Sequence, residues 1–290
     1  MLIRVSLRLL SFLPLPWAHA LAGVLGRLSY RFGSTSAHIT RCNLKLCFPD
    51  MPAAEREALV KTSLIDTMKT GCELGLAWLS PMRKSLASVV KVTGVDLVED
   101  ASKAGRGVIV LAPHLGNWEL AGLYLSTLGK TTYLFKPPSL KGFEELMTQV
   151  RSRGGARLVP TNRRGVAQIF KALERAEIVG ILPDQEPKDE GGVFAPFFGN
   201  QALTMTLVPK IAAKTKALVL TMVMRRLPKS EGFELVFEPA EKGIDSEDVL
   251  VAATAMNKSV ENCVLQAVSQ YQWEYRRFKR QPDNTKNSLY

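Results

Sequence analysis

Residues 108–122 read VIVLAPHLGNWELAG. The run opens with four aliphatic residues and is broken at Pro113, so it predicts a buried strand that ends in a turn. Asn117 is a good capping residue for a helix that begins near Trp118. The stretch is therefore a strand–turn–helix unit. It places His114 just beyond the carboxyl end of a strand, where open α/β sheets bind their ligands.

The same alternation of strands and helices continues on both sides of this unit. Strands are predicted at 88–92, 107–112, 131–135, 156–159, 178–182 and 217–224, with 233–238 as an antiparallel edge strand. Helices are predicted at 52–80, 117–128, 140–150, 165–175, 204–214 and 246–270. This order indicates an α/β fold with a mostly parallel central sheet flanked by helices.

The composition is that of a folded protein with one large domain. The chain has 290 residues, of which 46% are hydrophobic and 22% charged, and these values exclude the disordered and coiled-coil classes. The four cysteines form no C-x-x-C pair, and there are only three histidines. We therefore expect no disulfide scaffold and no metal site, and the cysteine pattern fits a reducing compartment.

The net charge of +11 is concentrated in three stretches. Residues 1–49 carry six basic side chains and no acidic one, and residues 130–171 carry nine basic side chains against Glu144 and Glu145. Residues 276–290 carry five against Asp283. Concentrated positive charge beside apolar sequence predicts contact with anionic lipid, a phosphorylated substrate, an acidic protein or nucleic acid. Charge alone does not choose among them.

The N-terminal segment is the first feature that favours lipid. Residues 9–26 read LLSFLPLPWAHALAGVLG, a mostly apolar run with basic residues on both sides. A bilayer span needs about 20 apolar residues, so the run is marginal for spanning and also fits a helix that lies in the membrane interface. A buried helix, or a signal peptide cleaved near Ala18–His19–Ala20, is the alternative. We expect residues 1–33 to form a membrane-associated helical arm and residues 34–290 to form the main domain.

Several nucleotide and hydrolase motifs are missing from the sequence. Gly105–Arg106–Gly107 lacks the third glycine of a dinucleotide-binding loop, and Gly129–Lys130–Thr131 lacks the first glycine of a phosphate loop. The chain has no G-x-S-x-G elbow either. These absences argue against nucleotide-driven chemistry and against a serine nucleophile of that type.

His114 and Glu119 are the pair with the clearest chemical potential. Within one helix they would point about 140° apart, at roughly 100° per residue. Because His114 precedes the helix, the carboxylate can turn back toward it. A carboxylate that orients an imidazole leaves the other ring nitrogen free as a general base. The alternative is that His114 only ends the strand and Glu119 only favours the helix dipole.

Four stretches in order resemble one enzyme family. They are PHLGNWE at 113–119, Asn162–Arg163–Arg164 ahead of a helix, ILPDQEP…GVFAPFFG at 181–199, and YQWEYRRFKRQP at 271–282. The first resembles the H-x4-[DE] box of the glycerolipid-type acyltransferase superfamily. All four together resemble its lipid A late-acyltransferase branch, the lauroyl and myristoyl transferases of lipopolysaccharide synthesis. The resemblance extends over nearly the whole chain.

The resemblance implies functional roles for residues that could otherwise be purely structural. It implies His114 and Glu119 as catalytic residues, with Glu119 orienting His114, and it places Asp184 by the active site. It implies a substrate-binding arginine, Arg163 or Arg164, suited to phosphate. We also expect Asn117 to face the substrate, and the backbone N–H groups of residues 115–117 to stabilise an oxyanion. Phe194, Phe197 and Phe198 are core residues or a wall of an acyl channel. The aromatic and basic tail at 271–282 is expected to dock on the protein or to contact lipid phosphates.

The implied reaction is O-acyl transfer without a metal or other cofactor. The donor would be an acyl thioester of acyl carrier protein, and the acceptor a hydroxyacyl chain of a lipid A precursor, at the cytoplasmic face of the inner membrane. Another acceptor, an ornithine lipid or a glycolipid, is the alternative within the same chemistry. A basic module that binds membrane or nucleic acid without activity is the alternative from a different class, and intact His114 and Glu119 argue against it.

Overall fold

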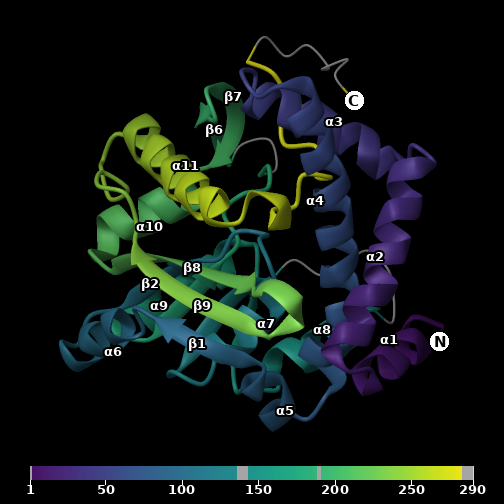
Figure 1. Ribbon diagram of the computed structural model, residues 1–290. Helices are drawn as coiled ribbons and strands as arrows, with labels where there is room; N and C mark the ends of the chain where they lie inside the picture. Colours follow the sequence, from purple (N-terminus) through teal and green to yellow (C-terminus); the bar gives the residue numbers. More distant parts are fainter. Residues whose placement is uncertain (1, 136–142, 188–190, 283–289) are drawn as a thin grey trace.

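The computed structural model describes residues 2–135, 143–187, 191–282 and 290. The first part of the chain is helical: α1 (Leu2–Phe12), α2 (Leu15–Arg31), α3 (Thr35–Cys47), α4 (Ala53–Leu74), the π-helix η1 (Gly75–Leu79) and α5 (Met82–Ala87). Strands and helices then alternate from β1 (Val89–Thr93) to β9 (Phe233–Pro239), and α11 (Val249–Gln266) follows them. Figure 1 shows this order, with the N-terminal helices beside the α/β part.

A seven-stranded sheet forms the centre of the molecule, and its order is β1-β9-β8-β2-β5-β3-β4. The remaining strands are β2 (Val108–Leu111), β3 (Thr131–Phe135), β4 (Arg157–Pro160), β5 (Ile178–Ile181) and β8 (Leu218–Arg226). β8, β2, β5, β3 and β4 are parallel to one another, whereas β9 is antiparallel to β8. The predicted α/β fold with a mostly parallel sheet is confirmed.

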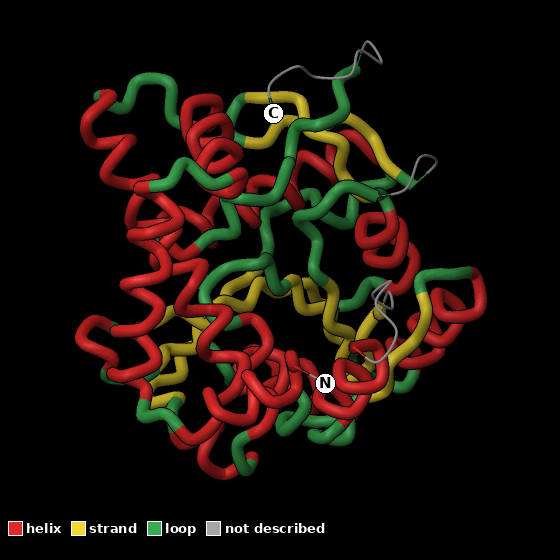
Figure 2. Tube along the Cα trace, turned by 90° about the vertical axis from the view of Figure 1, so that its right-hand side faces the viewer, coloured by secondary structure: helices red, strands yellow, loops and turns green. Residues whose placement is uncertain are grey.

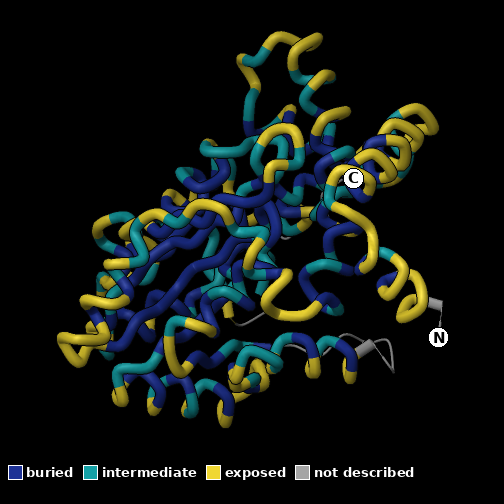
Figure 3. Tube along the Cα trace, turned by 60° about the horizontal axis from the view of Figure 1, so that its bottom comes forward, coloured by how far each residue is buried: buried dark blue, intermediate teal, exposed yellow. Residues whose placement is uncertain are grey.

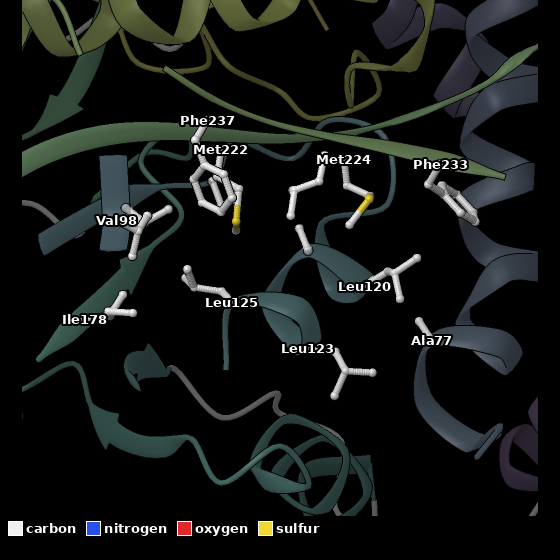
Figure 4. Close-up of a cluster of buried hydrophobic side chains, with 14 of the residues drawn as sticks. Ala77, Val98, Leu120, Leu123, Leu125, Ile178, Met222, Met224, Phe233 and Phe237 are labelled. Carbon is white, nitrogen blue, oxygen red and sulfur yellow. The ribbon is translucent and has the colours of Figure 1, made fainter. Parts of the chain in front are cut away.

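Helices cover both faces of the sheet because its central strands are apolar on both sides. Val108 and Val110 belong to one buried cluster, whereas Ile109 and Leu111, the alternate residues of β2, belong to another. The first cluster packs against α6 (Asp96–Lys103) and α7 (Trp118–Leu125), and Figure 4 shows Leu120, Leu123 and Leu125 of α7 in it. The second packs against α9 (Arg163–Glu174), α10 (Leu207–Thr215) and α11. Figure 2 shows helices around the strands of the sheet, and Figure 3 shows buried stretches of chain through the centre of the molecule.

Two predictions from the sequence are wrong. The strand at 233–238 is antiparallel as expected but is not at the edge, because β1 pairs with its outer side. Residues 204–205 are not helical: β6 (Gly192–Phe197) and β7 (Asn200–Met205) form a separate antiparallel hairpin, and α10 begins only at Leu207. Thr204 stays in the strand because it is fully buried, and its hydroxyl accepts a hydrogen bond from Asn257 of α11.

The N-terminal helices form an arm that packs on α4 and η1. The break between α1 and α2 falls at Pro14, which disfavours a helical conformation at Leu13. Gly26 of α2 lies so close to α4 that an added Cβ would be 2.5 Å from the Cα of Ile65. The outward side of the arm carries large apolar side chains, among them Trp17 at 70% exposure and Phe32 at 77%. Within the described part of the chain, no helix has the length and apolar character needed to cross a bilayer.

Candidate active site

The register of β2 and β5 brings two candidate residues together. These strands are neighbours in the sheet, and Leu111 pairs with Ile181. His114 lies three residues after Leu111, and Asp184 lies three residues after Ile181. Since neighbouring parallel strands are about 4.8 Å apart and end at the same edge, the two following turns lie side by side. Sheet topology therefore sets His114 against Asp184.

Asp184 holds His114 at two points. Its Oδ1 lies 2.8 Å from Nδ1 of the imidazole, and its Oδ2 accepts the backbone N–H of His114 at 2.9 Å. The Asp184 side chain is 2% exposed. Burial opposes its ionisation, but the charge and hydrogen bonds of His114 outweigh burial and lower the pKa of the carboxyl. The pair fixes the ring and leaves Nε2 as the nitrogen that can accept a proton.

The remaining neighbours of the ring close the site around Nε2. The amide nitrogen of Gln185 is 3.3 Å from Nε2 of His114 and also 3.3 Å from Oε1 of Gln272. The ring of Trp118 stands edge-on to the imidazole, with centroids 5.0 Å apart. The backbone N–H of Gln272 donates to the carbonyl of His114 at 3.0 Å. The C-terminal segment thus helps to build the site.

Glu119 does not orient His114, contrary to the expectation from spacing. Its carboxylate accepts both Nε and Nη2 of Arg151, the former at 3.1 Å, and the indole N–H of Trp78 at 3.0 Å. Burial opposes its ionisation, but the charge and hydrogen bond of Arg151 outweigh this and lower the pKa of the Glu119 carboxyl. The first turn of α7 directs Glu119 toward α8 (Phe143–Ser152), which carries Arg151. The carboxylate that binds the imidazole is Asp184.

The turn between His114 and α7 is rigid and internally satisfied. Gly116 has φ +62°, and a Cβ there would lie 1.9 Å from the carbonyl oxygen of Met224, so only glycine fits. The N–H groups of Leu115, Gly116 and Asn117 donate to the carbonyls of Pro113, Gln270 and Met224 at 2.7, 3.0 and 2.9 Å. The expectation that these groups form an oxyanion hole is therefore wrong.

Asn117 caps α7, as its position in the sequence predicted. Its side-chain oxygen accepts the N–H of Leu120 at 2.9 Å, which caps α7. Its amide nitrogen donates to Glu73 at 3.0 Å, and the residue is 1% exposed. Both polar groups are thus used inside the protein. Asn117 positions the turn and does not face a substrate.

Two cavities meet at Trp118, which lines both. One is apolar and runs between α7 and the sheet, and its lining includes Leu123, Leu125, Tyr133, Ile181 and Met222 together with Glu119 and Arg151. The other is lined mainly by polar residues: Thr67, Thr70, Gln270, Gln272 and Glu274. Burial raises the pKa of the Glu274 carboxyl, which accepts the hydroxyl of Thr67 at 3.0 Å. His114 lies beside Trp118, which belongs to both linings.

The other predicted residues lie away from this junction. Arg163 and Arg164 are exposed at the start of α9, after β4 at the edge of the sheet. Three strand spacings separate β4 from β2, roughly 14 Å, so neither arginine adjoins His114.

Of the three phenylalanines, Phe197 is 1% exposed in a core cluster, which Phe198 packs against, and both belong to the β6–β7 hairpin region.

The C-terminal aromatic and basic segment docks on the protein, which was one of its two expected roles. Trp273 and Phe278 are each 1% exposed, and Arg277 donates to the carbonyl of Leu203 at 2.7 Å. Residues Lys136 and Lys141 of the predicted basic stretch, and Asp283 and Lys286 near the C-terminus, lie outside the described residues. Among the described residues, His, Cys, Asp and Glu form no cluster that could hold a metal ion.

Arg151 is the site residue that sequence reasoning missed. It belongs to the basic stretch at 130–171 but to no motif, and α8 brings it to Glu119 across 32 residues of sequence. The available signal was indirect. A buried acidic residue at the start of α7 needs a cation, and the nearest basic stretch follows the next strand.

Comparison with known proteins identifies the family of the chain. Residues 1–280 match the family described as bacterial lipid A biosynthesis acyltransferase. The chain is 31% identical to a lipid A biosynthesis lauroyltransferase of Escherichia coli (strain K12) over 93% of its length and 88% of the relative's. It is 30% identical to a palmitoleoyltransferase of the same pathway and organism, over 96% and 90%. A myristoyltransferase from that organism is 25% identical, over 86% and 77%. The chain belongs to the bacterial lipid A biosynthesis acyltransferase family and is an acyltransferase of lipopolysaccharide synthesis.

Proposed function

We propose that this enzyme moves a fatty acyl chain from acyl carrier protein to the hydroxyl of a hydroxyacyl chain on a lipid A precursor. The observation that carries the proposal is the His114–Asp184 pair beside Trp118, where a cavity lined mainly by apolar residues meets one lined mainly by polar residues. Acyl transfer to a lipid hydroxyl needs a base between a place for the acyl chain and a place for a polar acceptor. No metal or cofactor takes part in the proposed reaction.

The proposed step is direct transfer within a ternary complex. Nε2 of His114 takes the proton of the acceptor hydroxyl while that oxygen attacks the carbonyl carbon of the thioester. The carbon–sulfur bond then breaks, and the proton on Nε2 passes to the leaving thiolate, which gives an ester and a free thiol. Asp184 stabilises the imidazolium that forms between the two events. The Gln185 amide must move off Nε2 to admit the hydroxyl.

Glu119 is a positioning residue in this proposal, because it acts through Arg151. Arg151 uses Nε and Nη2 on Glu119, so Nη1 is the nitrogen left for a substrate oxygen. Both residues line the apolar cavity, where the acyl chain would lie with its thioester near Trp118. A guanidinium held in this wall can stabilise the negative charge that develops on the carbonyl oxygen.

The arm at residues 1–33 would bind the cytoplasmic face of the inner membrane and present the domain at 34–290 to its lipid substrate. Exposed apolar side chains lie along both arm helices: Leu9, Phe12, Trp17, Leu21, Val24 and Leu28. Arg8, Arg27 and Arg31 are exposed on the same helices. Apolar side chains with arginines at their borders suit an interface of acyl chains and anionic headgroups.

Arg163 and Arg164 would bind an anionic group at the same edge of the sheet as His114. They suit a phosphate on the acceptor or an acidic face of the carrier. High salt should therefore raise the KM for the carrier-bound donor more than the KM for a small acyl thioester. Equal effects would count against electrostatic steering of the carrier.

The test incubates the detergent-solubilised protein with lauroyl-carrier protein and a radiolabelled tetra-acylated lipid A precursor that bears Kdo. We expect a product heavier by one acyl chain, and we expect it to be lost in His114→Ala, because removal of a general base costs about 10² to 10⁴ in rate. Activity of His114→Ala above a tenth of wild type would contradict the assignment. Product with an ornithine lipid but not with the precursor would show the alternative acceptor.

A further inference from the structure

A buried charged cluster lies behind the turn that carries His114, and the proposed mechanism does not use it. Glu73, near the end of α4, has a fully buried carboxylate. Its Oε1 accepts Nε of Arg226 at 2.5 Å and Nε2 of His19 at 2.7 Å. The side chains of Arg226 and His19 are 3% and 9% exposed. Burying a carboxylate together with such partners carries a large desolvation cost. We therefore asked what the cluster does.

The cluster holds the catalytic turn from one side. Oε2 of Glu73 accepts the side-chain amide of Asn117 at 3.0 Å. Nη2 of Arg226 donates to the carbonyl of Gly116 at 3.2 Å and also to Thr70. The cluster thus contacts Gly116 and Asn117, whose conformations are tightly constrained. Gly116 has a left-handed backbone, and Asn117 caps α7.

The cluster holds the N-terminal arm from the other side. His19 lies on α2, between Trp17 and Leu21, which are 70% and 42% exposed on the outward face. Its Nδ1 is 2.8 Å from the hydroxyl of Ser230, in the connection between β8 and β9. The contact of His19 with Glu73 leads to the catalytic turn in one further hydrogen bond, to Asn117, or in two, through Arg226 to Gly116.

We propose that Glu73 is a positioning residue that ties the seating of the N-terminal arm to the geometry of the His114 turn. This inference rests on the proposed function, since it concerns the same site. The arm then contributes to catalysis itself as well as to binding of a surface. Loss of the His19 contact frees one side of the Glu73 carboxylate and loosens the hold on Asn117. A displacement of about 1 Å at a catalytic group can cost 10²-fold in rate.

The experiment compares two matched histidine variants. His19→Ala removes the arm's contact with Glu73, whereas His38→Ala replaces an exposed histidine on the neighbouring helix α3. Turnover is measured in detergent micelles with lauroyl-carrier protein and the lipid A precursor, so that docking on a bilayer does not limit the rate. We expect His19→Ala to lower kcat roughly tenfold with little change in KM. His38→Ala should leave both unchanged.

A second readout does not depend on activity. The chain has three histidines, so its imidazole NMR signals are few, and the two variants identify the signals of His19 and His38. The remaining signal belongs to His114. We expect it to move or broaden in His19→Ala and to keep its position in His38→Ala. If wild type transfers no acyl chain, the proposed function fails, and this readout still decides the coupling.

Glu73→Gln gives the direct test of the positioning residue. We expect a larger fall in kcat than in His19→Ala, up to about 10²-fold, with the same change in the His114 signal. Where this variant does not fold, His19→Ala with Ser230→Ala carries the test. A lower melting temperature with unchanged kcat and an unchanged His114 signal would show a purely structural cluster and overturn the proposal.

Discussion

Two buried carboxylates flank the turn after β2, and they carry out different tasks. Asp184, at the end of β5, binds a side chain that can gain and lose a proton. Glu119, in the first turn of α7, binds a guanidinium whose charge does not change at any ordinary pH. The first pair can take part in proton transfer. The second can only fix a permanent charge in the wall of a cavity.

The difference follows from the elements that carry the two residues. β5 is parallel and adjacent to β2, so whatever follows it by three residues lies next to His114. α7 turns away from the sheet edge and lies over the first buried cluster, so Glu119 faces α8 and the apolar cavity. The loss of each carboxylate should therefore affect turnover and stability to different extents, and the following predictions test this.

Asp184→Asn should have the largest effect on turnover. The amide keeps the shape but cannot stabilise the imidazolium, and it can favour the wrong tautomer of His114. We expect kcat to fall about 10² to 10⁴-fold, as for loss of general-base catalysis. Steady-state kinetics beside a thermal melt would measure this. A fall of less than tenfold would mean that Asp184 is not the partner that matters.

Glu119→Gln should affect both stability and turnover. Removal of one partner of a buried ion pair costs about 3 kcal/mol of unfolding free energy, because Arg151 is left uncompensated. We expect kcat to fall roughly 10 to 100-fold through the displaced guanidinium. Urea denaturation and kinetics measure the two effects.

The double variant Glu119→Gln/Arg151→Met separates these effects. Replacing both partners of a buried pair is often close to neutral for stability, so the double variant should recover stability. It should not recover turnover if Arg151 stabilises the oxyanion. Recovery of both would make the pair a structural feature of the cavity wall.

The sequence was sufficient to predict the sheet core but not the partners in the site. β2 and β5 were predicted to within one or two residues because they are continuous aliphatic runs bounded by Pro113 and Pro183. The β6–β7 hairpin was missed because Thr204 and Met205 resemble the start of the apolar helix that follows. Burial against α11 and Arg277, which lie far along the chain, keeps Thr204 in a strand.

The candidate site, too, could be predicted only in part from local sequence. His114 and Asp184 could each be placed at a strand end from local sequence. Their contact depends on β2 and β5 being neighbours, and strand order is not a local property. Glu119, which is close to His114 in the sequence, was therefore predicted as its partner in place of Asp184. Arg151 and Glu73 belong to no motif, and only the packing of α8 and α4 brings them to the site.

Acidification should weaken the stabilisation that Glu119 provides. The folded-state pKa of Glu119 is lowered, so its contribution is fully present above the unfolded value of about 4.3 and is lost as pH falls through the folded value. The difference in unfolding free energy between wild type and Glu119→Gln should therefore be constant above about pH 5 and narrow below it. Denaturant titrations at several pH values measure this. A difference that stays constant down to pH 3 would show that Arg151 does not hold Glu119 ionised.

The smallest effect is the coupling between the two carboxylates. Asp184 binds His114, whereas Glu119 binds Arg151 and Trp78, so the two share no hydrogen-bond partner. The unfolding free energies lost in Asp184→Asn and Glu119→Gln should therefore add to within about 0.5 kcal/mol in the double variant. Asp184→Asn with His114→Ala should be far from additive in kcat, because residues that act as one unit are lost together. Strong coupling between Asp184 and Glu119 in stability would join the two pairs into one network. The conformation of the His114 turn would then depend on both carboxylates, and the two would not have separate roles.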